Sequence, residues 1–357
     1  MNLSGSFYKD KPLFGLDIGH ASLKIMQIDR SNAKLSVITG YGVSRFAPEA
    51  IQNGVIIKPE VLAQAAHDLF EKNLVGSITS KRVACSLPTS HSFSRLIKIP
   101  AMDHKDIAEA IRLEAEQYIP VPLDSLYLDY EIVQQDAQNI DLLLVATSKT
   151  IVDSYLNLLQ ALSLEPVVFE PSMSATSRLL KVLEVNNSEP LILVDIGSVS
   201  TDITIHDNAM LVASSVNSGS DSMTNLISKN LRLTTPQADQ LKNQFGISYS
   251  DRQQRIIDAI KPQLESLTHE IEKSIRYHDE KAAKAGNRIS QIFTVGGGSV
   301  MPGLNQYLSR ELRLPTQTMD PWQKITFGDL TKPDEADRSI YITVAGEAML
   351  NPLEVAR

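Results

Sequence analysis

Two stretches of the chain share one pattern of apolar and polar positions. In residues 13–29 and 191–207, an apolar run enters an Asp-Ile-Gly turn and an alternating segment follows. This pattern is typical of a buried strand, a tight turn and a second strand. The offset between the copies is constant, since 195 − 17 = 178 and 207 − 29 = 178. A duplicated hairpin that opens each half of the chain predicts two related lobes facing each other.

Periodic patterns predict the elements that follow the first hairpin. The strands continue as a three-strand meander over 13–45, with a turn at Asn53-Gly54 and a helix from Pro59. Next come strands at 82–88 and 93–99, a helix at 104–118 capped by Asp103, a strand pair at 126–133 and 140–146, and a helix at 150–163. We predict that residues 83–169 form a compact β-α-β-β-α insert within the first lobe.

The second half of the chain is predicted to be richer in helices. A short strand at 166–171 leads into a helix capped by Ser172, and residues 186–190 are typical of a linker. After the second hairpin, helices are expected at 223–231, 236–246 and 253–285, the last kinked at Pro262. A buried strand at 292–295 enters a glycine loop, and helices are expected from Pro302 and over 339–350.

Composition narrows the class of protein. A chain of 357 residues is long enough for two domains with substantial cores. The net charge of −8 makes nucleic acid an unexpected partner. The single cysteine, Cys85, stands in an apolar run, which excludes a disulfide framework and fits a small core residue. The sequence has neither a signal-peptide core nor an apolar run of about 18 residues, so we expect a cytoplasmic protein that meets a membrane only through a partner.

The chemistry is expected at the ends of the buried strands. Asp17 and Asp195 end two of them, and a carboxylate there is costly unless a cation or a donor receives it. Taken alone, each hairpin is more typical of an ordinary β-turn. The duplication instead favours a nucleotide cleft, in which turn amides face phosphates and the two carboxylates hold a hydrated Mg²⁺. Lys24 adds a cation, and Gly296-Gly297-Gly298 lets the backbone approach a flat ring.

These loops resemble the two phosphate loops and the adenosine loop of the actin/Hsp70/sugar-kinase ATPase superfamily. The resemblance implies ATP and Mg²⁺ as cofactors, with Asp17 and Asp195 contacting the metal through water. It implies a catalytic Glu170 beside the metal-bound water, although no further general base supports fast hydrolysis. His20 stands where small hydroxyl residues are usual. The implied nucleotide contacts are Asp17, Gly19, His20, Ser22, Lys24, Asp195, Gly197, Ser198, Ser200, Thr201, Gly219, Lys242, Gly296, Gly297, Gly298 and Ser299.

Within that superfamily, nearly the whole chain resembles the PilM family, the actin-like proteins of type IV pilus assembly. The similarity is carried by 13–19, by 86–88 with 95–100, and by 110–120. It implies an α/β fold of duplicated ribonuclease-H-like lobes, with a cell-division-type insert called 1C at 83–169. Subdomain 1A would comprise 1–82, 170–189 and 340–357, subdomain 2A 190–224 and 290–339, and the helical subdomain 2B 225–289.

The resemblance also implies a function. The chain would be an ATP-binding scaffold of the inner-membrane platform, holding the cytoplasmic N-terminal peptide of PilN in a groove between 1A and 1C, with affinity set by lobe closure. Two alternatives are a small-molecule kinase and a polymerising cell-division actin homologue. The latter would want an amphipathic C-terminal helix, for which residues 351–357, with Pro352, are too short. Hydrolysis, self-association and the groove residues are left open.

Overall fold

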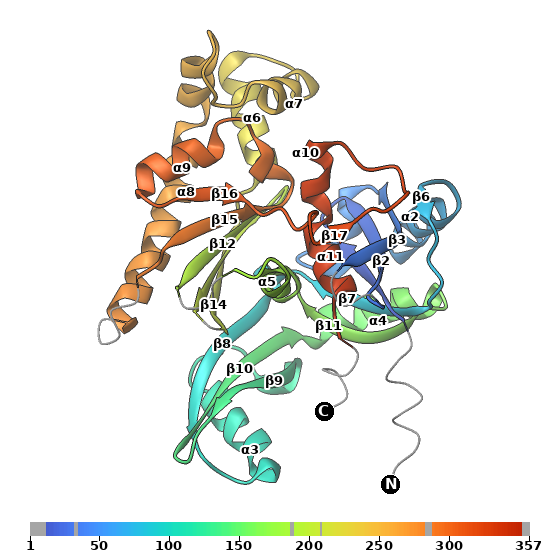
Figure 1. The fold of residues 1–357 in the computed structure, drawn as a ribbon, viewed down its shortest axis with the longest axis vertical. Helices are drawn as coiled ribbons and strands as arrows, with labels where there is room; N and C mark the ends of the chain where they lie inside the picture. Colours follow the sequence, from blue (N-terminus) through green and yellow to red (C-terminus); the bar gives the residue numbers. More distant parts are fainter. Residues whose placement is uncertain (1–11, 32–34, 186–188, 208, 283–287, 352–357) are drawn as a thin grey trace.

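The computed structural model describes residues 12–31, 35–185, 189–207, 209–282 and 288–351 (Figure 1). Two large sheets stand side by side, and each contains one copy of the duplicated hairpin. The first copy is formed by β1 (Phe14–Ile18) and β2 (Ser22–Asp29), and the second by β12 (Leu191–Ile196) and β13 (Thr201–Asp207). The predicted duplication is therefore confirmed at the level of local structure.

The first sheet has seven strands in the order β11-β7-β1-β2-β3-β17, with β6 also paired to β3. The meander is completed by β3 (Ser36–Arg45), as predicted, and β7 (Arg82–Leu87) and β11 (Glu165–Pro171) extend the sheet in parallel. Beyond β3, one edge of the sheet is formed by β6 (Leu74–Gly76) and β17 (Ile325–Thr326), and the opposite edge is β11. A small hairpin, β4 (Ile51–Gln52) with β5 (Val55–Ile56), turns at Asn53-Gly54, where both residues have positive φ, as its turn type requires.

The second sheet has eight strands in the order β16-β15-β12-β13-β14-β8-β10-β9. Its further strands are β14 (Ala209–Val216), β15 (Gln291–Val295), β16 (Thr316–Thr318), β8 (Ser92–Pro100), β10 (Asn139–Ser148) and β9 (Leu126–Gln135). The helices of this half are α6 (Ser220–Leu231), α7 (Thr235–Gln244), α8 (Gln253–Ala282), α9 (Leu304–Leu312) and α10 (Glu335–Arg338). The apolar faces of α6, α7, α8 and α9 pack with β12, β13 and β15 in one buried core, with Ile192, Ile203 and Ile260 among its members.

Residues 92–148 form a unit with a core of its own. The unit contains β8, β9, β10 and α3 (His104–Ala115), and its buried side chains include Ile99, Ile107 and Leu142. The other elements of the predicted insert belong elsewhere: β7 and β11 lie in the first sheet, and α4 (Lys149–Ala161) packs with α2 (Pro59–Lys72) against that sheet. The compact insert is thus narrower than 83–169, whereas the subdomain boundaries stay a prediction.

Two helices fill the space between the sheets. They are α5 (Ser172–Val182) and α11 (Ile342–Ala348), and Figure 1 shows them side by side at the centre of the molecule. The core around them takes residues from both lobes, such as Met26 of β2 and Leu193 of β12. At their crossing, a Cβ on Gly346 would lie 2.0 Å from the carbonyl oxygen of Ala175. Only glycine allows the backbones of α5 and α11 to approach so closely. Because the surrounding core takes residues from both lobes, the lobes meet at this crossing.

Several predicted details are wrong at helix ends. Asp103 holds the N-cap position of α3, but its side chain accepts no capping hydrogen bond. Ser172 is the first residue of α5 and bonds the Thr89 hydroxyl, so it does not cap the helix. The helices predicted from Pro302 and over 339–350 are shorter, at 304–312 and 342–348.

Three further predictions concern Pro262, the linker and the membrane. Pro262 lies inside α8. Residues 186–188 of the predicted linker lie outside the described residues. In the described part of the chain, no helix is long and apolar enough to cross a membrane.

Candidate functional site

The two hairpin turns have the same backbone geometry. In the first, the amide of Gly19 donates to the carbonyl of Ser22 over 2.9 Å, and in the second, the amide of Gly197 donates to the carbonyl of Ser200 over 3.0 Å. These bonded pairs are related by the same 178-residue offset, since 197 − 19 = 178. Both turns line a single cleft of about 1630 Å³. The duplicated sequence therefore places two equivalent loops opposite one another.

In the first lobe, Asp17 is fully engaged by its own chain. Lys24, directly across the hairpin, donates its ammonium group to Oδ2 over 2.8 Å. The hydroxyl of Ser86, at the end of β7, donates to Oδ1 over 2.9 Å. The two charged side chains are only 12% and 13% exposed, which makes this a buried ion pair. The pair neutralises the carboxylate and fixes its orientation toward the cleft.

In the second lobe, the matching position has the opposite charge. Asp202 stands across the hairpin from Asp195, where the first lobe has Lys24, since 24 + 178 = 202. Burial, together with the charges of Asp202 and Asp17, raises the pKa of Asp195 to about 7, while Lys24 opposes the shift. Burial also raises the pKa of Asp202 to about 6, although a hydrogen bond from Ser215 lowers it. Two adjacent carboxyl groups without a cation form a site that suits a divalent metal or a proton.

The glycine loop closes this wall of the cleft. It follows β15, whose residue Val295 pairs with Asp195 on the neighbouring strand. Gly296 has φ = +80°, and a Cβ there would lie 2.2 Å from the Asp195 carboxylate. At Gly298 a Cβ would meet the side chain of Ile196 at 2.4 Å. The loop thus packs its bare backbone against the second hairpin, and Gly297 and Gly298 form part of the cleft surface.

Most of the predicted nucleotide contacts lie together in the cleft wall. They are Asp17, Gly19, His20, Ser22, Lys24, Asp195, Gly197, Ser198, Ser200, Lys242, Gly296, Gly297 and Gly298. Three others lie one layer behind. Thr201 donates its hydroxyl to the carbonyl of Ser218, Ser299 donates to the carbonyl of Gly296, and Gly219 packs where a Cβ would meet the Gly197 carbonyl oxygen at 2.5 Å. These three shape the loops and do not line the cleft.

Lys242 brings a second cation to the cleft from α7. Its ammonium group donates to the hydroxyls of Ser220 and Thr224 over 2.6 and 2.7 Å and pairs with Asp239 at 3.0 Å. Since Lys242 is 3% exposed, its position is fixed by α6. The first amides of that helix in turn bond the second turn, with Ser220 donating to the Gly197 carbonyl. Helix, lysine and turn form one rigid unit.

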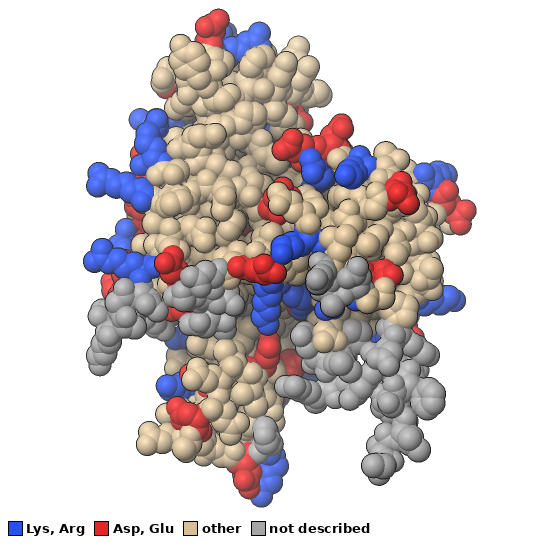
Figure 2. All heavy atoms as spheres, viewed as in Figure 1, with Lys and Arg blue, Asp and Glu red and all other residues tan. Residues whose placement is uncertain are grey.

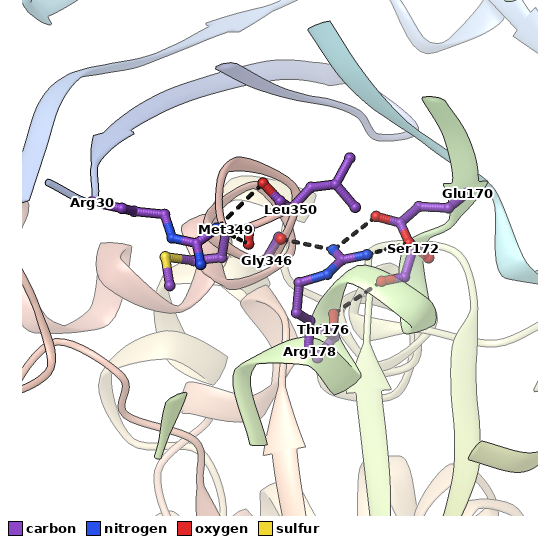
Figure 3. Close-up of polar contacts among 8 residues, drawn as sticks. All are labelled: Arg30, Glu170, Ser172, Thr176, Arg178, Gly346, Met349 and Leu350. Atoms are coloured by element: carbon purple, nitrogen blue, oxygen red, sulfur yellow. Dashed lines mark hydrogen bonds and ion pairs between the residues drawn. The ribbon is translucent and has the colours of Figure 1, made fainter. Parts of the chain in front are cut away.

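Glu170 is held at the crossing of α5 and α11. Both of its oxygens accept from the Arg178 guanidinium, over 2.8 and 2.7 Å, and Arg178 also donates to the Gly346 carbonyl (Figure 3). The bidentate ion pair thus ties β11 to the helix crossing. Glu170 is not among the residues that line the cleft, and its place beside a metal-bound water stays a prediction.

Two residues of the site were missed from the sequence. Asp202 was detectable, because applying the 178-residue offset to Lys24 leads directly to it. Ser86 was not, because its contact with Asp17 spans 69 residues and depends on β7 lying beside β1. The residue types fit a phosphorylated ligand that carries a divalent cation, because the cleft wall holds two lysines, two glycine turns and carboxylates on both sides.

Charged side chains of both signs lie at one side of the cleft. Figure 2 shows acidic side chains over α10 with basic side chains beside them. Asp334, Asp337 and Lys332 all line the cleft there.

Comparisons with known proteins agree with this architecture. The sequence model of the family described as "Type IV pilus assembly protein PilM" matches residues 15–351. The cell division protein FtsA of Bacillus subtilis (strain 168) is 24% identical over 262 residues, covering 66% of this chain and 58% of that protein. The match thus spans less than two thirds of that relative.

Solved structures extend the agreement to the fold. The structure of a "PilM-PilN type IV pilus biogenesis complex" gives a TM-score of 0.80 at 23% identity, covering 97% of this chain and 99% of that one. MreB5 of Spiroplasma citri bound to AMPPNP gives 0.55 at 13% identity, covering 94% and 95%. The predicted actin-like α/β fold is confirmed.

Proposed function

Because the chain belongs to the PilM family of type IV pilus assembly proteins, we propose that it is an ATP-binding scaffold whose lobe closure sets its affinity for a partner peptide. The supporting observation is the pair of facing hairpins, with Asp17–Lys24 on one wall and Asp195–Asp202 on the other. Its place would be the cytoplasmic side of the inner membrane, reached through that partner.

The proposed ligand is ATP with Mg²⁺. The turn amides and Lys24 would face the phosphates, while Asp17 and Asp195 would hold the metal through water. The bound metal would neutralise Asp195, whose pKa is raised by burial and by the neighbouring charges of Asp202 and Asp17. Titration calorimetry tests this: Asp195→Ala should abolish binding of ATP–Mg²⁺, and Asp68→Ala, on the outer helix α2, should leave it unchanged. Equal binding by both variants would refute the cleft assignment.

Hydrolysis is proposed to be slow, because the carboxylate expected to act on the attacking water is bound to Arg178. A metabolic kinase of the same fold would instead need an acid or base near an acceptor hydroxyl. A phosphoryl-transfer screen separates these functions: turnover above about 1 s⁻¹, the low end of kinase rates, would favour the kinase. Polymerisation, the other alternative, is tested by light scattering with ATP.

The proposed partner is the cytoplasmic N-terminal peptide of PilN, since PilN is the protein bound to PilM in the solved PilM-PilN complex. Its proposed site is the junction of the unit 92–148 with the first lobe. There Tyr127 of β9 is 47% exposed and donates its hydroxyl to Asp153 of α4, and Lys149 lies 5.6 Å from the ring centroid. An exposed aromatic ring between a cation and a carboxylate suits a peptide with apolar and charged side chains.

A matched pair of variants tests this partner site. Tyr127→Ala should weaken binding of a fluorescent PilN peptide by about tenfold, as expected for loss of an aromatic anchor. Tyr249→Ala is the control, because Tyr249 is 98% exposed between α7 and α8. Fluorescence anisotropy measures both. A loss with Tyr249→Ala alone would move the site to the helical half of the chain.

A further inference from the structure

The unit 92–148 belongs to one lobe by sequence and to the other by hydrogen bonding. Its chain leaves the first sheet after β7 and returns to that lobe through α4. Yet its three strands continue the second lobe's sheet, because β8 pairs antiparallel with β14. Figure 1 shows β14 running alongside β8 at the base of the second sheet. A rotation of one lobe against the other must therefore act on this unit.

The junction between β14 and β8 is an antiparallel strand pair in which Val212 is in register with Arg95. Among the described side chains, the core cluster around Ile99 and Leu142 shares no member with the cluster around Ile192 and Ile260. The strand pair is therefore a direct link by which the sheet of the second lobe reaches the unit.

The unit is also attached to the first lobe. Besides the two chain connections, the Tyr127 hydroxyl bonds Asp153 of α4, and just before β8 the amide of Met173 donates to the Thr89 hydroxyl over 3.1 Å. Both lobes therefore hold the unit, and a rotation of one lobe against the other must shift the unit relative to at least one of them.

The other side of the junction leads directly to the second phosphate-loop turn. β14 follows β13 along the chain and pairs with it. Thr201, the first residue of β13 after the turn, is in register with Val216, the last residue of β14. On the near side, the Arg95 guanidinium lies 3.9 Å from the ring centroid of Tyr118, a residue on the surface of the unit. A continuous path of paired strands thus connects the cleft to the surface of residues 92–148.

We propose that the β14–β8 junction transmits lobe closure to the unit 92–148, so that occupancy of the cleft changes the partner surface by straining or opening this pair. The inference rests on the proposed nucleotide-linked function and names the element that performs the coupling. Because the coupling free energy is reciprocal, a junction that couples peptide to nucleotide must also couple nucleotide to peptide.

A reversible crosslink tests the proposal. Residues directly opposite in an antiparallel pair have Cα atoms about 4.5–5.5 Å apart, within the range for a disulfide. The double variant Val212→Cys with Arg95→Cys should therefore form one on mild oxidation. The natural Cys85 is fully buried and should not compete. The same protein with reductant is the control, because it carries both substitutions but leaves the strands free.

The measurement is the affinity of the PilN peptide with and without ATP–Mg²⁺, by anisotropy. In the reduced protein, nucleotide should change the affinity by about 5- to 150-fold, the usual range of coupling, and in the crosslinked protein by less than about twofold. Amide hydrogen exchange of 92–100 and 209–216 in the wild type should change on adding nucleotide.

Three results would count against the proposal, each in a different way. Full nucleotide dependence in the crosslinked protein would overturn the role of the junction while leaving the proposed function intact. Wild-type protein that binds both ligands with no coupling would overturn the proposed function and the junction's role together. Unchanged exchange at 209–216 in coupled wild-type protein would place the transmission elsewhere.

Discussion

Replacing Gly346 by Ala would place a methyl group at the crossing of the two helices that join the lobes. Two effects oppose each other. Ala is favoured over Gly inside a helix by about 1 kcal/mol, which would stabilise α11. The added Cβ, however, would lie 2.0 Å from the Ala175 carbonyl oxygen and 2.5 Å from its carbonyl carbon. Both are backbone atoms of α5, so no side chain can rotate away.

The clash should win. Overpacking of a filled core costs about 1–3 kcal/mol and sometimes more, and a contact this short requires α5 and α11 to separate. Separation would also stretch the bond from Arg178 to the Gly346 carbonyl, now 2.8 Å. Because the clash is with backbone atoms, we take the upper end of that cost, about 3 kcal/mol; subtracting the gain in helix propensity of about 1 kcal/mol leaves an expected destabilisation by Gly346→Ala of about 2 kcal/mol.

Urea denaturation followed by circular dichroism measures this effect as a lower midpoint. Gly297→Ala is the matched control, because the nearest atom to its added Cβ is the Ile340 side chain at 3.6 Å, an ordinary contact. Its free energy of unfolding should stay within about 0.5 kcal/mol of that of the wild type. A Gly346→Ala protein as stable as the wild type, or more stable, would refute the inferred tight crossing.

Two further predictions concern the charges of the cleft. Lys24→Met leaves buried Asp17 without its cation and should lower the free energy of unfolding in urea by about 3 kcal/mol. Lys72→Met, in an exposed ion pair, is the control and should lower it by less than about 0.5 kcal/mol. Similar losses in the two variants would contradict the argument from burial. Burial raises the pKa of Asp202 from 3.8 to about 6 and that of Asp195 to about 7. Between about pH 4 and 7 the folded state therefore binds more protons than the unfolded state, and the nucleotide-free protein should lose stability as the pH rises through this range. Thermal melts should show a shallower loss for Asp202→Asn; equal slopes would contradict the shared-site account.

Local pattern was enough to predict the hairpins, the meander and the glycine loop. Each of these is encoded within a short window, as in the Asp-Ile-Gly turns whose Gly19 and Gly197 amides make equivalent bonds. The constant offset then implied that both turns face one cleft. For the same reason, most predicted contact residues line that cleft, since they belong to loops whose shape is local.

What the sequence did not reveal depends on contacts between distant segments. Glu170 was expected at the metal because residues 170–175 resemble the first connecting helix of the superfamily, and the sequence did not show that Arg178, eight residues later, donates to both of its oxygens. The extent of the insert was also missed, because periodicity shows that β7 is a strand without showing that it pairs with β1. Helix ends were displaced by a few residues, as at the end of α3, which stops at Ala115 although a helix over 104–118 was predicted.

The duplicated hairpin also shows how one scaffold supports two electrostatic roles. Both copies have the same turn and the same aspartate, and they differ in the cross-strand residue, Lys24 in one and Asp202 in the other. The first lobe therefore supplies its own counter-ion and can face phosphate directly. The second lobe holds paired carboxyl groups that a proton or a metal must neutralise before an anion can approach. Because the two walls enclose one cleft, a phosphate ligand that carries its own Mg²⁺ satisfies both at once. Nucleotide without metal would leave the second wall repulsive, so the proposed requirement for magnesium would follow from a single charge difference between the two copies.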